Sequence, residues 1–174
     1  MAGPANEGLP RGSFEDGREP KVLIVAAPYY RGVAGALLRG ARAEVEAWGA
    51  THELAEVPGA LELAPAIAMA ARLGEFHAFV ALGCVIRGET SHYDTVCQES
   101  AHGLTLLGLQ GTPVGNGILT VETIEQAEVR ADPEGQNKGG GAAAAALHLL
   151  ALSRRFQRPE KGLGFLRERL GAAP

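Results

Sequence analysis

The residues best suited to chemistry lie in one run, from Gly83 to Asp94, where an apolar strand enters a glycine turn that opens a helix. His92 falls at the start of that helix. The positive end of the helix macrodipole favours the neutral imidazole, which can accept a proton and return it. Gly88, Glu89 and Thr90 can point backbone N–H groups at an anion, and the Thr90 hydroxyl adds a donor. The run predicts acid–base chemistry beside an anionic ligand.

A plainer interpretation of His92 is a surface histidine without a role. Its place after a Gly-x-Thr-Ser turn at a strand end favours the chemical interpretation. The remaining histidines lack such a setting, and we expect no function of them: His52, His77, His102 and His148.

Alternating strands and helices must position these residues. Short apolar runs, rich in β-branched residues where the signal is strongest, predict strands, and apolar spacing of three to four residues predicts helices. Ser91 and Asp94 have the spacing of a capping box. The alternation implies parallel strands with right-handed crossovers, an α/β fold with three αβα layers and a central four-stranded parallel sheet. The expected strands are 21–27, 51–57, 77–86 and 113–120, and the expected helices are 33–48, 61–73, 91–109, 123–131 and 138–153.

In such folds, ligands collect at the carboxyl ends of the strands. The segments expected at those ends should therefore surround one site. They are Pro28–Tyr30, Pro58–Glu62, Arg87–His92 and Gly115–Gly117.

Several other side chains have two possible roles. A bound phosphate favours an arginine partner, and Arg87 and Arg130 are candidates. Arg130 could instead form a surface salt bridge, and Lys138 could simply begin its helix. Glu62 could bind a ligand or cap free N–H groups. Tyr29 could stack on a flat heterocycle or pack against the sheet edge.

Composition narrows the classes of function. The 174 residues carry a formal net charge of -4 and 5% aromatic residues, which argues against a nucleic-acid partner. Two cysteines, Cys84 and Cys97, are too few for a disulfide framework and are expected to be packing residues in a reducing cytoplasm. No stretch is long enough to span a membrane, and no nucleotide or metal motif occurs. We expect a flexible N-terminal extension (1–20), one domain (21–153) and a C-terminal tail (154–174).

Taken together, several motifs resemble lumazine synthase, collinearly from about Lys21 to Ser153. They are Val57–Glu62, Leu82–Asp94, Pro113–Val114, Gly117–Thr120, Glu125–Ala127 and Asn137–Gly139. The resemblance implies a flavodoxin-like fold and an enzyme of riboflavin biosynthesis. The implied reaction condenses 5-amino-6-(D-ribitylamino)uracil with 3,4-dihydroxy-2-butanone 4-phosphate to 6,7-dimethyl-8-ribityllumazine, without a cofactor or metal.

The resemblance also implies roles, position by position. His92 matches the proton-transfer histidine, Arg130 matches the arginine that binds the substrate phosphate near the Gly88–Thr90 amides, and Lys138 matches a lysine of the same site. Tyr29 falls where a phenylalanine stacks on the pyrimidine ring. The segments that hold the ribityl chain and the pyrimidine correspond to Ala60, Leu61 and Glu62, and to Val85 and Ile86.

In this family the site lies between subunits of a homo-pentamer, so Asn116, Arg130 and Lys138 would come from the neighbouring chain. A shell of twelve pentamers is the larger alternative. Tyr30, Asn116 and Gly141 replace an asparagine, a phenylalanine and a glutamate common in the family. These departures motivate a second hypothesis, a scaffold that binds a flavin-like ligand without turnover. A flavodoxin-like electron carrier would need a hydroxyl-rich phosphate loop after the first strand, which the chain lacks.

Overall fold

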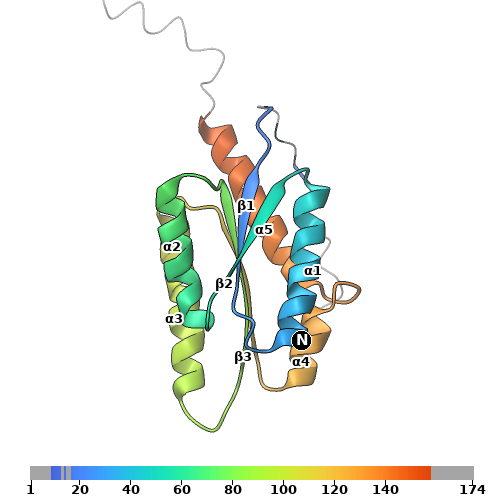
Figure 1. The fold of residues 1–174 in the computed structure, drawn as a ribbon, viewed down its shortest axis with the longest axis vertical. Helices are drawn as coiled ribbons and strands as arrows, with labels where there is room; N and C mark the ends of the chain where they lie inside the picture. Colours follow the sequence, from blue (N-terminus) through green and yellow to red (C-terminus); the bar gives the residue numbers. More distant parts are fainter. Residues whose placement is uncertain (1–8, 13, 15–16, 158–174) are drawn as a thin grey trace, which may run out of the picture.

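The computed structural model describes residues 9–12, 14 and 17–157 (Figure 1). Strands and helices alternate along the chain as predicted. In order, they are β1 (Lys21–Ala26), α1 (Arg31–Ala47), β2 (Thr51–Glu56), the 3₁₀ turn η1 (Ala60–Glu62), α2 (Leu63–Leu73), β3 (Ala78–Ile86), α3 (His92–Leu109), β4 (Val114–Val121), α4 (Ile124–Ala131) and α5 (Lys138–Gln157).

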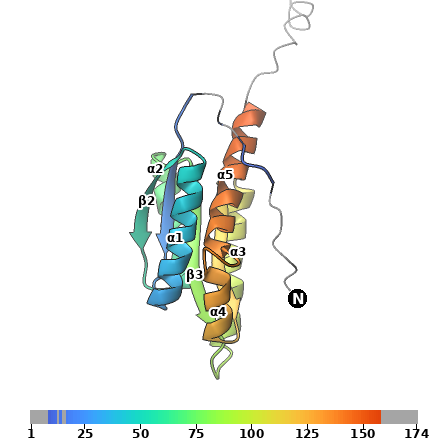
Figure 2. The ribbon, with the colours of Figure 1, turned by 90° about the vertical axis from the view of Figure 1, so that its right-hand side faces the viewer.

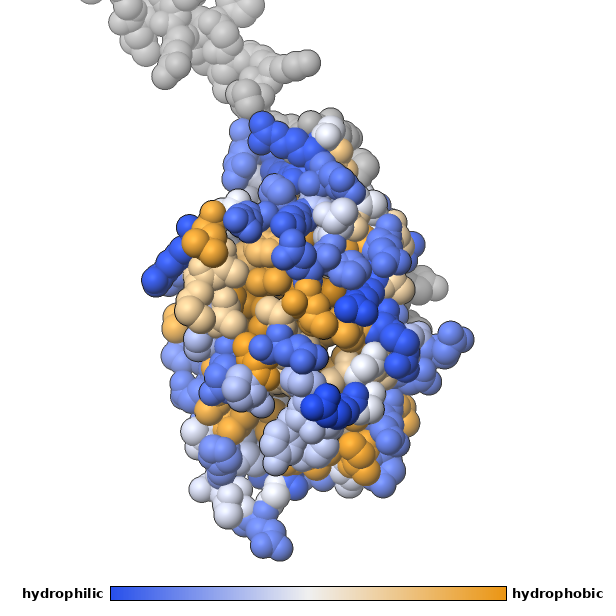
Figure 3. All heavy atoms as spheres, viewed as in Figure 1, coloured by the Kyte–Doolittle hydropathy of each residue, from blue (hydrophilic) through white to orange (hydrophobic). Residues whose placement is uncertain are grey.

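The four strands form one parallel sheet in the order β2-β1-β3-β4, which confirms the predicted α/β class. β1 and β3 are central, and most of their residues are buried, as is typical of strands covered on both faces. β2 is an exposed edge strand in front in Figure 1, and hydrophobic residues reach the surface in the middle of this face in Figure 3. Glu53 and Glu56 of β2 discourage the addition of another strand at this edge.

The helices cover the sheet in two layers. Helices α1, α4 and α5 pack on one face around Ile24, Leu37 and Leu147, and Figure 2 shows this layer from the front. Helices α2 and α3 pack on the other face around Leu63 and Ile67. The layers are thus the αβα sandwich that the sequence predicts, and the carboxyl ends of the strands meet at one end of it.

Helix α5 packs closely against both α1 and β4. A Cβ at Gly139 would collide with the carbonyl oxygen of Leu37, and a Cβ at Gly115 would collide with the carbonyl oxygen of Ala142. Glycine at these positions allows the close approach of two backbones. The approach places the first turn of α5, which includes Lys138, beside the outer edge of the sheet.

Three local predictions were wrong. The helix expected from Leu61 begins as a 3₁₀ turn, because the Glu62 N–H bonds to the Gly59 carbonyl oxygen (3.2 Å). Ser91 forms no capping box, because its side chain accepts no hydrogen bond and Asp94 pairs with Arg87 instead.

The helix expected to end at Ser153 continues to Gln157. The Arg154 guanidinium donates to the Arg18 carbonyl oxygen (2.9 Å) and lies 5.0 Å from the Phe14 ring centroid, which holds this last turn. Residues 154–157 of the predicted tail are therefore helical, and residues 158–174 lie outside the described part of the chain.

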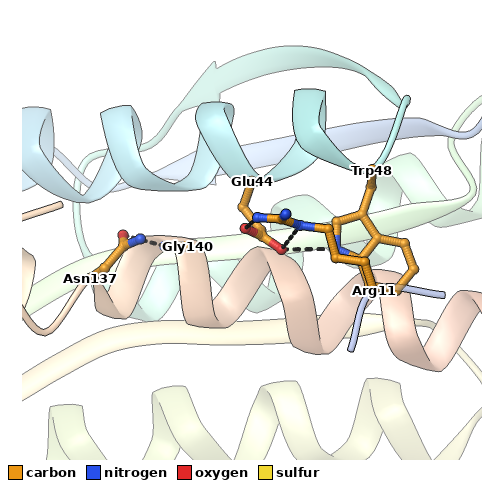
Figure 4. A network of polar contacts seen from close by, with 5 residues as sticks. All are labelled: Arg11, Glu44, Trp48, Asn137 and Gly140. Carbon is orange, nitrogen blue, oxygen red and sulfur yellow. Dashed lines mark hydrogen bonds and ion pairs between the residues drawn. The ribbon is translucent and has the colours of Figure 1, made fainter. Parts of the chain in front are cut away.

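The described part of the expected N-terminal extension lies against α1 and α5. Arg11 donates two hydrogen bonds to the Glu44 carboxylate (2.8 and 3.0 Å), which also accepts one from the Trp48 indole (2.9 Å; Figure 4). The Phe14 ring lies 5.7 Å from that of Trp48. The hydrogen bond from Arg11, assisted by the one from Trp48, lowers the pKa of Glu44 below its usual value. This contact anchors the segment by charge as well as by packing.

Candidate active site

The loop from β3 to α3 presents His92 and a row of free backbone donors. The Arg87 N–H bonds to the Val121 carbonyl oxygen (3.0 Å), which continues the sheet by one residue. Among the described residues, the N–H groups of Gly88–Thr90 donate no hydrogen bond, and these residues are exposed. His92 is the first residue of α3 and is exposed as well. The loop thus exposes both His92 and these N–H groups at the end of β3.

Arg87 is engaged by carboxylates rather than free for a phosphate. Its guanidinium forms ion pairs with Glu122 (2.9 Å) and Asp94 (3.2 Å) and lies 4.1 Å from the centre of the Tyr93 ring. The hydrogen bond to Glu122 is the main reason that the pKa of Arg87 is raised. Of the two arginines that the sequence left open, Arg87 thus holds the loop in place, and Arg130 remains the candidate for the phosphate.

Glu122 is a residue that sequence reasoning missed. Ile86 and Val121 are partners in the parallel register of β3 and β4, so the residues that follow them, Arg87 and Glu122, emerge side by side. The contact between Arg87 and Glu122 could be predicted only once β3 and β4 were known to pair in this register.

Tyr29 follows β1 and is 75% exposed, so it does not pack against the sheet edge. Its ring and the Tyr30 ring form a T-shaped pair with centroids 5.1 Å apart, and the exposure of Tyr29 leaves ring surface available for stacking. Tyr30 is half-buried, and burial raises its pKa, with a smaller contribution from Cys84. Cys84 is itself buried in β3, as expected for a packing residue, and burial raises its pKa to about 11.

The turn η1, which carries Ala60, Leu61 and Glu62, packs against α3 and β3. The Glu62 side chain caps no helix N–H, so the capping role that the sequence left open is not observed. Val85 and Ile86, at the end of β3, are partly exposed on the same end of the sheet. These residues, with Tyr29, Gly88–Thr90 and His92, form a first group, which we call the histidine group.

A second group lines a groove along the outer edge of β4. The groove has a volume of about 410 Å³ and runs between β4, the end of α4 and the start of α5. Its lining includes Asn116, Arg130, Lys138 and Gly141 but no residue of the histidine group. We call it the β4 groove.

One prediction from strand ends was wrong. Gly115–Gly117 do not end β4 but lie inside it, because β4 continues to Val121. The glycines make room for neighbours rather than turn the chain: a Cβ at Gly115 would collide with the backbone of α5, and one at Gly117 with the Leu82 side chain of β3. Asn116 therefore lies in the β4 groove, away from the strand end where it was expected.

The β4 groove carries two cations without carboxylate partners among the described residues. Arg130 lies in the last turn of α4, is half-buried, and donates to the Gln126 carbonyl oxygen (3.0 Å). Lys138 is the first residue of α5, as one of its two predicted roles requires, and is exposed. No ion pair of either residue is found in the described part of the chain, so the surface salt bridge considered for Arg130 is not observed. The groove suits an anion.

Within residues 9–12, 14 and 17–157, no group of three or more His, Cys, Asp or Glu side chains could hold a metal ion. No helix in that part of the chain is both long and apolar enough to cross a membrane.

Comparisons with known proteins identify the family. The model of the 6,7-dimethyl-8-ribityllumazine synthase family matches residues 19–154. A protein of that name from Jannaschia sp. is 53% identical over 165 residues, which cover 95% of this chain and 92% of the relative. Relatives of the same name from Sphingopyxis alaskensis (54% identity, 78% and 96% covered) and Methylorubrum populi (52%, 83% and 89%) agree. The chain belongs to the lumazine synthase family. It is thus a transferase of riboflavin biosynthesis, and the predicted resemblance and enzyme class are confirmed.

One departure from the lumazine synthase pattern, Gly141, can be placed in the structure. Gly141 lines the β4 groove, is exposed, and has nothing within 4 Å of the position that a Cβ would occupy. The Cβ of a glutamate at this position would therefore lie in open space. The described lining of the groove carries no carboxylate to offset Arg130 and Lys138.

Proposed function

We propose that the chain condenses 5-amino-6-(D-ribitylamino)uracil with 3,4-dihydroxy-2-butanone 4-phosphate. The aromatic amine adds to the ketone and forms an imine with loss of water. Phosphate leaves by elimination, and ring closure by the ribitylamino nitrogen releases a second water to give 6,7-dimethyl-8-ribityllumazine. No electron transfer is involved and no cofactor is required. Membership of the lumazine synthase family is the observation that carries the proposal.

His92 serves as the proton shuttle. It lies beside a row of unpaired N–H groups at the start of α3, where a neutral imidazole can take a proton from the reacting amine or carbon and return it to a leaving oxygen. Much of the remaining acceleration comes from holding the two substrates in contact.

Arg130 binds the phosphate together with the Gly88–Thr90 amides, and Lys138 completes the positive surroundings. In one chain, these amides and the β4 groove belong to different groups. We therefore propose that the site forms between neighbouring copies of the chain in a homo-pentamer, with Asn116, Arg130 and Lys138 supplied by the second copy. A shell of twelve pentamers is the larger alternative, and the compartment is the cytoplasm.

The remaining residues of the histidine group bind the other substrate. The exposed face of Tyr29 stacks on the pyrimidinedione, a role supported by its exposure and by its place after β1. Val85 and Ile86 lie beside the ring. Ala60, Leu61 and Glu62 hold the ribityl chain, for which the free carboxylate of Glu62 is a suitable acceptor.

The test is direct incubation of the purified chain with both substrates, followed by the fluorescence of the lumazine. We expect robust product from the wild type and a turnover lower by roughly a hundredfold or more in His92→Ala, since general acid–base catalysis typically contributes about 10²- to 10⁴-fold. His102→Ala is a matched control, because His102 lies on the same helix but outside the histidine group. Binding without any product would instead support the scaffold hypothesis raised by Tyr30, Asn116 and Gly141.

A further inference from the structure

The loop that joins α4 to α5 connects Arg130 to Lys138 and is closed by its own backbone. The N–H groups of Gly135 (3.0 Å) and Asn137 (2.9 Å) both donate to the Asp132 carbonyl oxygen. The loop therefore folds back on its own first residue rather than extending away from the domain. Because Asn137 directly precedes Lys138, contacts that fix Asn137 also fix the position of Lys138 relative to Arg130.

Asn137 is held in an uncommon conformation. Its φ of 45° is the only positive value of a non-glycine residue in the described chain. Its side-chain oxygen accepts a hydrogen bond from the Gly140 N–H (3.0 Å; Figure 4), and its carbonyl oxygen accepts one from the Gly141 N–H (2.9 Å). Asparagine is one of the few residues that tolerates this conformation and also caps a helix. Asn137 thus sets the point and direction at which α5 begins.

The Asn137 side chain is also wedged between two helices. A Cβ at Gly40 of α1 would collide with its amide oxygen, and a Cβ at Gly140 of α5 would contact its amide nitrogen too closely. The amide therefore fills a slot that only two glycines leave open. Asn137 is fixed by α1, by α5 and by the closed loop, which is more restraint than a helix cap requires.

We propose that Asn137 is a positioning residue that sets the place of Lys138 relative to Arg130 in the β4 groove. The inference rests on the proposed function, in which the two cations face the phosphate of the substrate. Asn137 does not touch the substrate. It acts because the next residue in the chain, Lys138, is held in one place and one direction.

The test compares Asn137→Gly with Lys138→Ala and with the double variant. Glycine allows the positive φ but removes the cap and the side chain that fills the slot. We expect the KM for the butanone phosphate to rise about tenfold in Asn137→Gly, with a smaller change in the KM for the pyrimidinedione. In the Lys138→Ala background, the same change should raise KM by no more than about twofold, because the cation to be positioned is gone.

Equal rises in both backgrounds would overturn the proposal, and so would an unchanged KM in Asn137→Gly. Glu44→Gln serves as a matched control, because it weakens a contact to Arg11 one turn beyond Gly40 on α1, outside the Asn137 slot, and should leave both KM values unchanged. If Asn137→Gly does not fold, Asn137→Ser, which keeps a capping oxygen, enters the same cycle. A wild type that forms no lumazine would refute the proposed function, whereas an active wild type with an insensitive Asn137 refutes only this inference.

Discussion

Arg130 offers the most informative single substitution. It is half-buried in the last turn of α4, its guanidinium donates to the Gln126 carbonyl oxygen, and it has no carboxylate partner among the described residues. Arg130→Ala should therefore cost little in folding, about 0.3–1 kcal/mol from the hydrogen bond and the helix dipole. The main loss should appear in the binding of the phosphate substrate.

The size of that loss follows from the chemistry of the contact. A hydrogen bond between charged groups is worth about 1.5–3 kcal/mol, which corresponds to roughly 10- to 150-fold in binding. We expect the KM for the butanone phosphate to rise by that factor, and the KM for the pyrimidinedione to change much less. Arg130→Lys should fall in between, because it keeps the charge and loses the two-pronged geometry of the guanidinium.

The assay is steady-state formation of the fluorescent lumazine with each substrate varied in turn. Arg155→Ala is the matched control, because Arg155 is also an arginine in the last turn of a helix but does not line the β4 groove. An unchanged KM for the butanone phosphate in Arg130→Ala would refute the assignment of the phosphate to Arg130. Equal effects of Arg130→Ala and Arg155→Ala would reduce its role to net charge.

Three further predictions concern stability and reactivity. The pKa of Glu44 is lowered in the folded chain, so the stability that its ion pair provides is present above the unfolded-state pKa and is lost as pH falls through the lower folded-state pKa. The fluorescence of Trp48, the only tryptophan, should therefore change on acidification below about pH 4.5. Glu44→Gln should abolish this change. In chemical denaturation, Gly141→Ala should raise the free energy of unfolding by about 0.5–1 kcal/mol, because its Cβ would lie in open space. Gly139→Ala should lower it by about 1–3 kcal/mol or more, because its Cβ would overpack the contact with α1. Cys84 should resist alkylation near pH 8 until denaturant is added, because it is buried and its pKa is raised to about 11; rapid modification in the folded chain would contradict this.

The central strands and the place of His92 were predictable because they depend on local pattern. Continuous apolar runs mark β1 and β3, and a glycine turn after β3 puts His92 at the start of a helix. These features need no knowledge of which elements are neighbours.

The features that were missed depend on distant neighbours. Arg87 pairs with Glu122 only because β3 and β4 lie side by side, and that ion pair network also draws Asp94 away from the expected capping box. Gly115–Gly117 were expected at a strand end, yet Gly115 serves the close approach of α5, and Gly117 leaves room for the Leu82 side chain of β3. A glycine in a strand has both meanings, and only the packing decides between them.

The central claim is that one active site uses His92 of one chain and Arg130 of the next. Mixing His92→Ala with Arg130→Ala subunits, by unfolding and reassembly together, tests it most directly. Each variant alone should have little activity at low butanone phosphate. In a random equal mixture, about a quarter of the sites combine an intact His92 with an intact Arg130, so activity should recover to about a quarter of the wild type. Activity no higher than the mean of the two variants, in mixtures shown to contain both chains, would contradict a site shared between subunits.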